Sequence, residues 1–185
     1  AVAHENGSLF HTDAVQTVGH VSINVHDIGV DMLSASAHKF NGPKGVGFLY
    51  IRNGLKIMPY SDGGAQEFGL RAGTENVAGI VGMAVALKNN CDALEENTRY
   101  VEGLESMLVS ILDRSDIKYV RNGGTSRLPG LLSLSFPDAD GGVILHRLDL
   151  TGICISTGSA CNGTSTDISH VLQAVQLEDR YAKGT

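Results

Sequence analysis

The sequence contains no tryptophan and carries few basic residues. Its 185 residues include 14 Lys and Arg against 20 Asp and Glu, which gives a formal net charge of −6. The Lys and Arg residues form no run. Binding to nucleic acid or to an anionic membrane surface depends on clustered basic residues, so we expect neither kind of partner.

Cysteine is also scarce, and long apolar runs are missing. Cys91, Cys154 and Cys161 are the only cysteines, and an odd number without regular spacing is a poor disulfide framework. We expect no metal site. The sequence shows neither a secretory signal nor an apolar run long enough to cross a bilayer. A reducing, cytoplasmic location is therefore our expectation.

What is present predicts an α/β fold. Hydrophobic residues make up 42% of the chain, enough for a buried core in one domain or parts of two. Short apolar or β-branched runs alternate with helical turns, which favours an α/β sheet. We expect strands at residues 8–12, 21–25, 30–36, 45–52, 117–121, 131–136 and 154–157. A helix end is expected at residues 1–7, and a helical turn or two at 13–19.

The middle of the chain has a helical pattern from Thr74 to about Asp113. Apolar residues recur there with a period close to 3.6, and Thr74 is a plausible N-cap. We expect a break near Asn97, and later helices at residues 143–152, ended by Gly152, and at 168–175. These features predict part of a sheet domain at 1–95 and a smaller α+β domain at 96–185.

The first cluster with possible chemistry combines Asp13 and Lys39 with Ser36 and His38. Both Asp13 and Lys39 follow expected strands, where α/β sheets place their ligands. A pyridoxal phosphate site needs an amine that bonds to the cofactor, an acid for its ring nitrogen and donors for its phosphate. These residue types supply all three. The alternative is a surface lysine in a turn, with Asp13 as a helix N-cap.

Two glycine-containing segments are weaker signals. Residues 63–76 bring several glycines to Thr74, where free N–H groups at a helix start favour an anion. Neither this segment nor residues 42–47 match a Walker loop or the dinucleotide fingerprint. A flexible loop with an ordinary helix cap is the alternative interpretation.

A third candidate is Cys161, which lies in a small, polar, glycine-flanked loop between an expected strand and a helix. An accessible thiol in a mobile loop can reach a substrate, and its thiolate is the reactive form. An exposed, unreactive thiol is the alternative. We expect Cys91 and Cys154 in the core or on a helix face.

Four motifs in this order and spacing resemble those of the cysteine desulfurases, which are class V aminotransferase-like, fold-type I pyridoxal phosphate enzymes. They are HTDAVQTVGH, SASAHKFNGPKGVGFLY, GLRAGTENVAGIVGMAVAL and ISTGSACNG followed by SHVLQAV. The resemblance covers nearly the whole chain. It implies a fold-type I α/β protein, with a partial large-domain sheet followed by a small α+β domain.

The resemblance also implies roles for individual residues. Lys39 matches the lysine that carries the cofactor and moves the Cα proton of the substrate. Asp13 matches the partner of the pyridinium nitrogen, and Gln16 the partner of the phenolic oxygen. Cys161 matches the cysteine that accepts sulfur as a persulfide. The phosphate ligands match at Ser36 and His38, together with Thr74, which in the family reaches the neighbouring subunit of a homodimer.

The implied reaction converts L-cysteine to L-alanine and passes the sulfur to an acceptor protein, such as an iron–sulfur scaffold. The sequence departs from the family pattern at Asp62, Ala65 and Phe68, where a histidine, a glycine and an arginine are frequent. The family's full chain is about twice as long on domain-size grounds. We therefore expect a C-terminal fragment that is inactive alone.

Two alternatives remain open from the sequence. A selenocysteine lyase or another class V enzyme would share Lys39 and Asp13. A non-catalytic sulfur carrier that binds a scaffold would need only the Cys161 loop and the small domain. The presence of Asp13, Gln16, Ser36, His38 and Lys39 together favours an enzyme.

Overall fold

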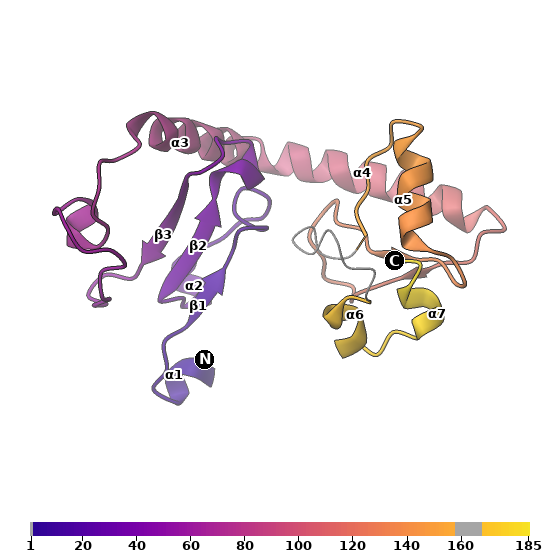
Figure 1. Ribbon diagram of the computed structural model, residues 1–185, viewed down its shortest axis with the longest axis horizontal. Helices are drawn as coiled ribbons and strands as arrows, with labels where there is room; N and C mark the ends of the chain where they lie inside the picture. The colour runs from indigo at the N-terminus through magenta and orange to yellow at the C-terminus, as the bar shows by residue number, and fades with distance from the viewer. Residues whose placement is uncertain (1, 158–167) are drawn as a thin grey trace. The chain divides into compact units, whose positions relative to one another are not determined.

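The computed structural model describes residues 2–157 and 168–185 (Figure 1). The chain divides into two compact units, Ala1–Tyr100 and Val101–Thr185, which are described separately. The division falls inside helix α4, Leu94–Asp113, five residues after the boundary that the sequence predicts between residues 95 and 96.

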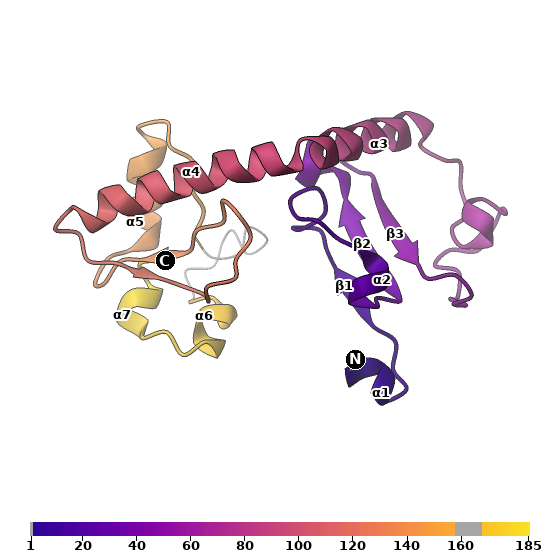
Figure 2. The same ribbon diagram turned by 180° about the vertical axis from the view of Figure 1, so that it is seen from behind.

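The first unit is built on a three-stranded sheet in the order β1-β2-β3 (Figures 1 and 2). Strand β1 runs parallel to β2, and β3 runs antiparallel to it. The strands are β1 His11–Asp13, β2 Met32–Ser36 and β3 Gly47–Ile51. The helices are α1 Val2–Glu5, α2 Val25–Ile28, the 3₁₀ turns η1 Ala37–Phe40 and η2 Glu67–Gly69, and α3 Val77–Asp92.

The core of this unit lies between the sheet and α3. Side chains alternate across a strand, and in β2 every second residue, Leu33 and Ala35, is buried. Phe40 is fully buried directly after this strand, and Met83 of α3 belongs to the same cluster. Helix α3 packs against η1, so the turn that follows β2 is held between the sheet and a helix.

Two of the expected strands are wrong. Residues 21–25 form no strand, because Asn24 caps helix α2 by accepting a hydrogen bond from the backbone N–H of His26. Residues 154–157 also form no strand, and Cys154 is exposed there rather than in a core. In both segments a short apolar run has no neighbouring strand to pair with among the described residues.

The N-cap and the break of the helical region both differ from the predicted positions. Asn76, not Thr74, caps α3, because its side chain accepts a hydrogen bond from the N–H of Gly79. The break occurs at Ala93, between α3 and α4. Asn97 lies inside α4, and its N–H donates to the carbonyl oxygen of Ala93.

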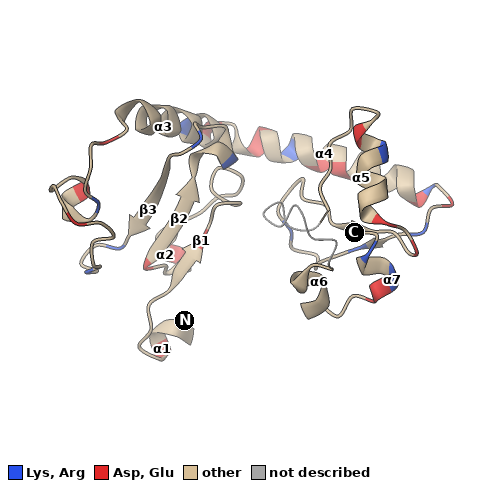
Figure 3. Ribbon diagram, in the orientation of Figure 1, with Lys and Arg blue, Asp and Glu red and all other residues tan. Residues whose placement is uncertain are grey.

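The acidic first turn of α4 fits its position in the helix. Glu95 and Glu96 lie at the N-terminus, where negative charge is favoured by the helix dipole. Acidic residues predominate along this helix (Figure 3), and Arg99 is its one basic residue. None of the helices in the described residues is long and apolar enough to span a membrane.

The second unit contains the antiparallel pair β4 Val120–Arg121 and β5 Leu134–Ser135. Its helices are α5 Gly141–Asp149, α6 His170–Ala174 and α7 Asp179–Ala182. Helix α5 ends at Asp149, three residues before Gly152, where the sequence predicted its end, and Gly152 has a φ of 80° in the turn that follows. The side chain of Ser135 is fully buried and contacts both Asn122 and Thr185, which joins this strand to the end of the described chain.

Candidate active site

The candidate site lies where β1 and β2 end. The two strands are parallel, and Asp13, the last residue of β1, pairs with Ser34 of β2. Parallel strands present their carboxyl ends at one edge of the sheet, which is where α/β sheets bind ligands. Asp13, Ser36, His38 and Lys39 therefore lie at the same edge of the sheet.

The carboxylate of Asp13 is exposed and only partly used by the protein. Its Oδ1 accepts a hydrogen bond of 3.0 Å from the N–H of Val15, which closes a tight turn. Among the described residues, no hydrogen bond or ion pair reaches Oδ2. The next residue, Ala14, donates its N–H to the carbonyl oxygen of Ser34 at 2.9 Å, so the Asp13 backbone is fixed to β2. Gln16 follows in the same turn and is exposed.

Ser36 and His38 form a polar pair at the end of β2. Ser36 Oγ and His38 Nδ1 lie 2.8 Å apart, and the imidazole is exposed. A hydroxyl and an imidazole side by side offer hydrogen-bond donors to an anion. The structure thus brings together the two side chains predicted to hold a phosphate.

Lys39 lies in η1, immediately after this pair, and its side chain is half-buried. In the part of the chain that the structure describes, no ion pair or hydrogen bond involves its amine. Its main chain is held firmly, because His20 Nε2 donates to the carbonyl oxygen of Lys39 at 2.7 Å. The amine is thus free to react while the backbone beneath it is fixed.

Thr74 does not join this group within one chain. It is exposed and precedes α3, whereas η1 contacts the other end of that helix through the bond from Asn90 Nδ2 to the Phe40 carbonyl oxygen. A helix rises about 1.5 Å per residue, so Asn76 lies about 20 Å along α3 from Asn90. A role for Thr74 at the site of a neighbouring copy stays a prediction.

The predicted sulfur-accepting residue, Cys161, lies outside the described residues. The two described cysteines, Cys91 of α3 and Cys154, are both exposed. We find no group of His, Cys, Asp and Glu that could hold a metal ion within residues 2–157 and 168–185.

Sequence reasoning missed His20 and Asn90, which both bind the main chain of η1. The signal for Asn90 was a polar residue on an apolar helical stripe, since it follows Met83 and Leu87 at helical spacing and is buried. No local pattern marked His20, because its partner Lys39 is distant in the sequence.

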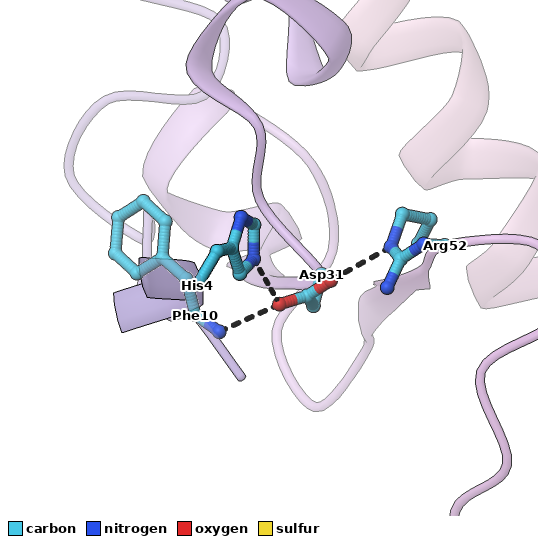
Figure 4. Close-up of polar contacts among 4 residues, drawn as sticks. All are labelled: His4, Phe10, Asp31 and Arg52. Atoms are coloured by element: carbon cyan, nitrogen blue, oxygen red, sulfur yellow. Dashed lines mark hydrogen bonds and ion pairs between the residues drawn. The ribbon is translucent and has the colours of Figure 1, made fainter. Parts of the chain in front are cut away.

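A second polar cluster lies at the opposite end of β2, around Asp31 (Figure 4). Asp31 is fully buried. It accepts hydrogen bonds from the N–H of Phe10 at 2.7 Å, from His4 Nε2 at 2.8 Å and from Arg52 Nε at 2.7 Å. The hydrogen bond from Phe10, followed by that from His4, lowers the pKa of Asp31 from 3.8 to about 2.

The fold and this edge of the sheet define an α/β protein with a carboxylate at the end of one parallel strand and a lysine in the turn after the next. Residues 1–177 match the family model described as aminotransferase class-V. The chain belongs to this family.

Individual relatives indicate which members of this family the chain resembles. The chain is 46% identical over 186 residues to "Cysteine desulfurase IscS" of Dictyoglomus turgidum, which covers 100% of this chain and 47% of the relative. A solved structure named "NIFS-LIKE PROTEIN" is 41% identical with a TM-score of 0.85, covering 97% of this chain and 46% of that one. Another, "SspA in complex with cysteine", is 34% identical with a TM-score of 0.75, covering 99% and 50%.

These matches confirm the predicted fold class, a fold-type I α/β architecture, and the predicted relationship to cysteine desulfurases. The chain spans about half the length of the curated relatives it matches.

Proposed function

We propose that the full-length protein containing this chain is a pyridoxal phosphate-dependent cysteine desulfurase, which converts L-cysteine to L-alanine. The observation that carries the proposal is 46% identity to a cysteine desulfurase along the whole chain. The geometry supports it, because Asp13 ends one strand and Lys39 follows the adjacent parallel strand at the same sheet edge. The similarity to SspA, which was solved in complex with cysteine, supports the substrate.

The residues present fit pyridoxal phosphate. The unused Oδ2 of Asp13 can accept a hydrogen bond from a protonated ring nitrogen, and the free Lys39 amine can bond to the cofactor. Ser36 and His38 offer donors for the phosphate, and exposed Gln16 follows Asp13 in the same turn. When bound, pyridoxal phosphate supplies a ring that takes up electrons from the substrate carbon.

Each residue then has a separate task. Lys39 would hold the cofactor, and its amine would move the proton of the substrate Cα. Asp13 keeps a negative charge beside the ring nitrogen. Cys161 receives the sulfur as a persulfide, since a thiolate is the nucleophilic form of cysteine.

The partners follow from the same proposal. A homodimer would bring Thr74 of one copy to the phosphate at the site of the other, which the distance along α3 within one chain supports. The persulfide on Cys161 would pass to a sulfur-acceptor protein, such as an iron–sulfur scaffold. We propose a cytoplasmic location, where thiols stay reduced.

Cofactor trapping tests this function. The full-length protein is incubated with pyridoxal phosphate and reduced with borohydride, and the modified peptide is mapped by mass spectrometry. We expect the adduct on Lys39. Lys39→Ala should lose the adduct and alanine release, whereas Lys44→Ala, which removes an exposed lysine of the same segment, should keep both. No selective adduct on Lys39 would overturn the cofactor assignment.

Two further measurements sharpen the assignment. Cys161→Ala should keep the Lys39 adduct but lose sulfur transfer from L-cysteine. If selenocysteine is strongly preferred over cysteine and the Cys161→Ala variant stays active, the protein is a selenocysteine lyase instead. We expect residues 1–185 alone to release no alanine, because they span less than half of the relatives.

A further inference from the structure

The turn that carries Lys39 cannot satisfy its own carbonyl groups. The 3₁₀ turn η1 contains four residues, too few for a continuous ladder of backbone hydrogen bonds. Ala37 receives bonds to its carbonyl oxygen from the N–H groups of Asn41 and Gly42. The carbonyl groups of Lys39 and Phe40 are bound by side chains from elsewhere in the fold.

His20 supplies the donor for Lys39 itself. Its Nε2 lies 2.7 Å from the Lys39 carbonyl oxygen, a short bond in which the ring nitrogen must carry the proton. His20 is half-buried, so this bond is partly shielded from water. Asn90 does the same for the next carbonyl, that of Phe40, at 2.8 Å.

The approach of His20 depends on the glycine before it. Gly19 has a φ of 81°, and a Cβ at this position would lie 2.8 Å from the Cβ of Phe40. A residue with a side chain would therefore push this turn away from η1. Gly19 rests on Phe40 while His20 reaches the carbonyl oxygen of Lys39, so the two segments meet at consecutive residues.

The segment that carries His20 is the one that begins with Asp13. A hydrogen-bonded turn connects them, since the N–H of Thr17 donates to Ala14 and the N–H of His20 donates to Thr17. The bond from His20 to Lys39 therefore fixes the turn that follows Asp13 to the turn that bears the lysine. The two groups proposed to hold opposite ends of one cofactor are linked through this contact.

We propose that His20 is a positioning residue: it fixes the Lys39 backbone relative to Asp13 and so sets where the lysine amine lies. This inference rests on the proposed function of Lys39. It concerns the main chain of Lys39, and it needs no contact between His20 and substrate or cofactor.

The test compares His20→Ala with His20→Gln in the full-length protein. Alanine removes the donor, whereas the amide nitrogen of glutamine can donate to the same carbonyl oxygen. Asp31→Asn is the control for stability, because it weakens the opposite end of the same strand. Thermal unfolding of all variants shows how much each destabilises the protein.

The first measurement needs no cofactor. Trace acetylation of the cofactor-free protein, read by mass spectrometry, gives the reactivity of the Lys39 amine relative to exposed Lys44. We expect His20→Ala to raise this ratio several-fold, because the half-buried lysine gains freedom. His20→Gln should restore the original ratio, and Asp31→Asn should leave it unchanged.

The second measurement is the rate of cofactor capture at Lys39 after borohydride reduction. We expect about a tenfold loss in His20→Ala, since small misplacements of a reacting group are costly. Glutamine should recover most of the rate. Equal effects of His20→Ala and Asp31→Asn in both measurements, or no effect of His20→Ala, would overturn the positioning role.

The outcomes separate this inference from the proposed function. A wild-type protein that forms no adduct on Lys39 would overturn the cofactor assignment, yet the acetylation ratios would still test the contact between His20 and Lys39. A wild-type adduct together with unchanged ratios in His20→Ala would keep the enzyme assignment and reject His20.

Discussion

Asp13 and Asp31 lie at opposite ends of the same parallel strand pair, and they are used differently. Asp31 is fully buried, and the carboxylate accepts from His4, Phe10 and Arg52 (Figure 4). Asp13 is exposed, and one of its oxygens has no partner among the described residues. A saturated carboxylate stabilises a fold, whereas an unsaturated one at a strand end can bind a ligand.

The same contrast holds for the positive charges. Arg52 is committed to Asp31, and its bond through Nε fixes β3 to the residue that precedes β2. The amine of Lys39 forms no hydrogen bond or ion pair in the described chain, although His20 binds its backbone carbonyl oxygen. The charged groups at one end of the sheet therefore bind each other, whereas in the described chain the Lys39 amine and one Asp13 oxygen at the other end have no partner.

The largest expected effect on activity comes from Asp13→Asn. Removing the charge beside the ring nitrogen should lower alanine release by the full-length protein about 100-fold or more, the usual result of losing one electrostatic stabiliser. Thermal unfolding should change little, because Asp13 is exposed and makes one hydrogen bond. An Asp13→Asn variant with wild-type turnover would remove the distinction between the two aspartates.

The largest expected effect on stability comes from Asp31→Asn. In this variant an amide nitrogen replaces one carboxylate oxygen of Asp31. The nitrogen cannot accept a hydrogen bond, so a donor that is bound to this oxygen would lose its partner. We expect the melting temperature to fall by roughly 10 °C, as measured by circular dichroism. Asp27→Asn, which changes an exposed aspartate of α2, is the matched control and should stay close to wild type.

Acid should act through Asp31 in a defined pH range. The pKa of Asp31 falls from 3.8 to about 2 on folding, chiefly because Phe10 and His4 bind its ionised form. A lowered pKa gives stability that is fully present above about pH 4 and is lost as the pH falls toward 2. Denaturant titrations from pH 5 to 2 should therefore show a steeper loss in wild type than in Asp31→Asn. Parallel curves would contradict this.

The smallest expected effect comes from an exposed ion pair. Lys88 and Asp92 lie 2.5 Å apart on successive turns of α3, and the hydrogen bond to Asp92 raises the pKa of Lys88. Both side chains are well exposed, so the solvent screens the pair. We expect Lys88→Ala to move the melting temperature by less than about 2 °C. If Lys88→Ala lowered the melting temperature as much as Asp31→Asn, burial would not explain the different contributions of the two ion pairs to stability.

The strand ends that carry the candidate residues were predictable, because local sequence carries their signal. An apolar run that ends in Ser36, followed by His38 and Lys39, indicated a strand end with polar chemistry, and β2 ends at Ser36. Asp13 was found in the same way, as the end of β1. The strand predicted at residues 154–157 failed, because short apolar runs form strands only where a neighbour pairs with them.

The helices, too, were predictable from local sequence in their location but not in their ends. The period of the apolar residues located α3 and α4, but Asn76 rather than Thr74 became the cap. Both residue types can cap a helix, and the choice depends on which side chain reaches a free N–H group. The break lies at Ala93, four residues before the predicted position at Asn97.

The sequence by itself determined the chemistry: a carboxylate and a lysine after two strands, with a serine and a histidine beside the lysine. Only the tertiary structure decided which charges are satisfied. Asp31 meets His4 and Arg52, and His20 meets the backbone of Lys39, across separations of 19 residues or more. Such contacts form only when segments distant in the sequence are brought together by folding, and no local periodicity encodes them.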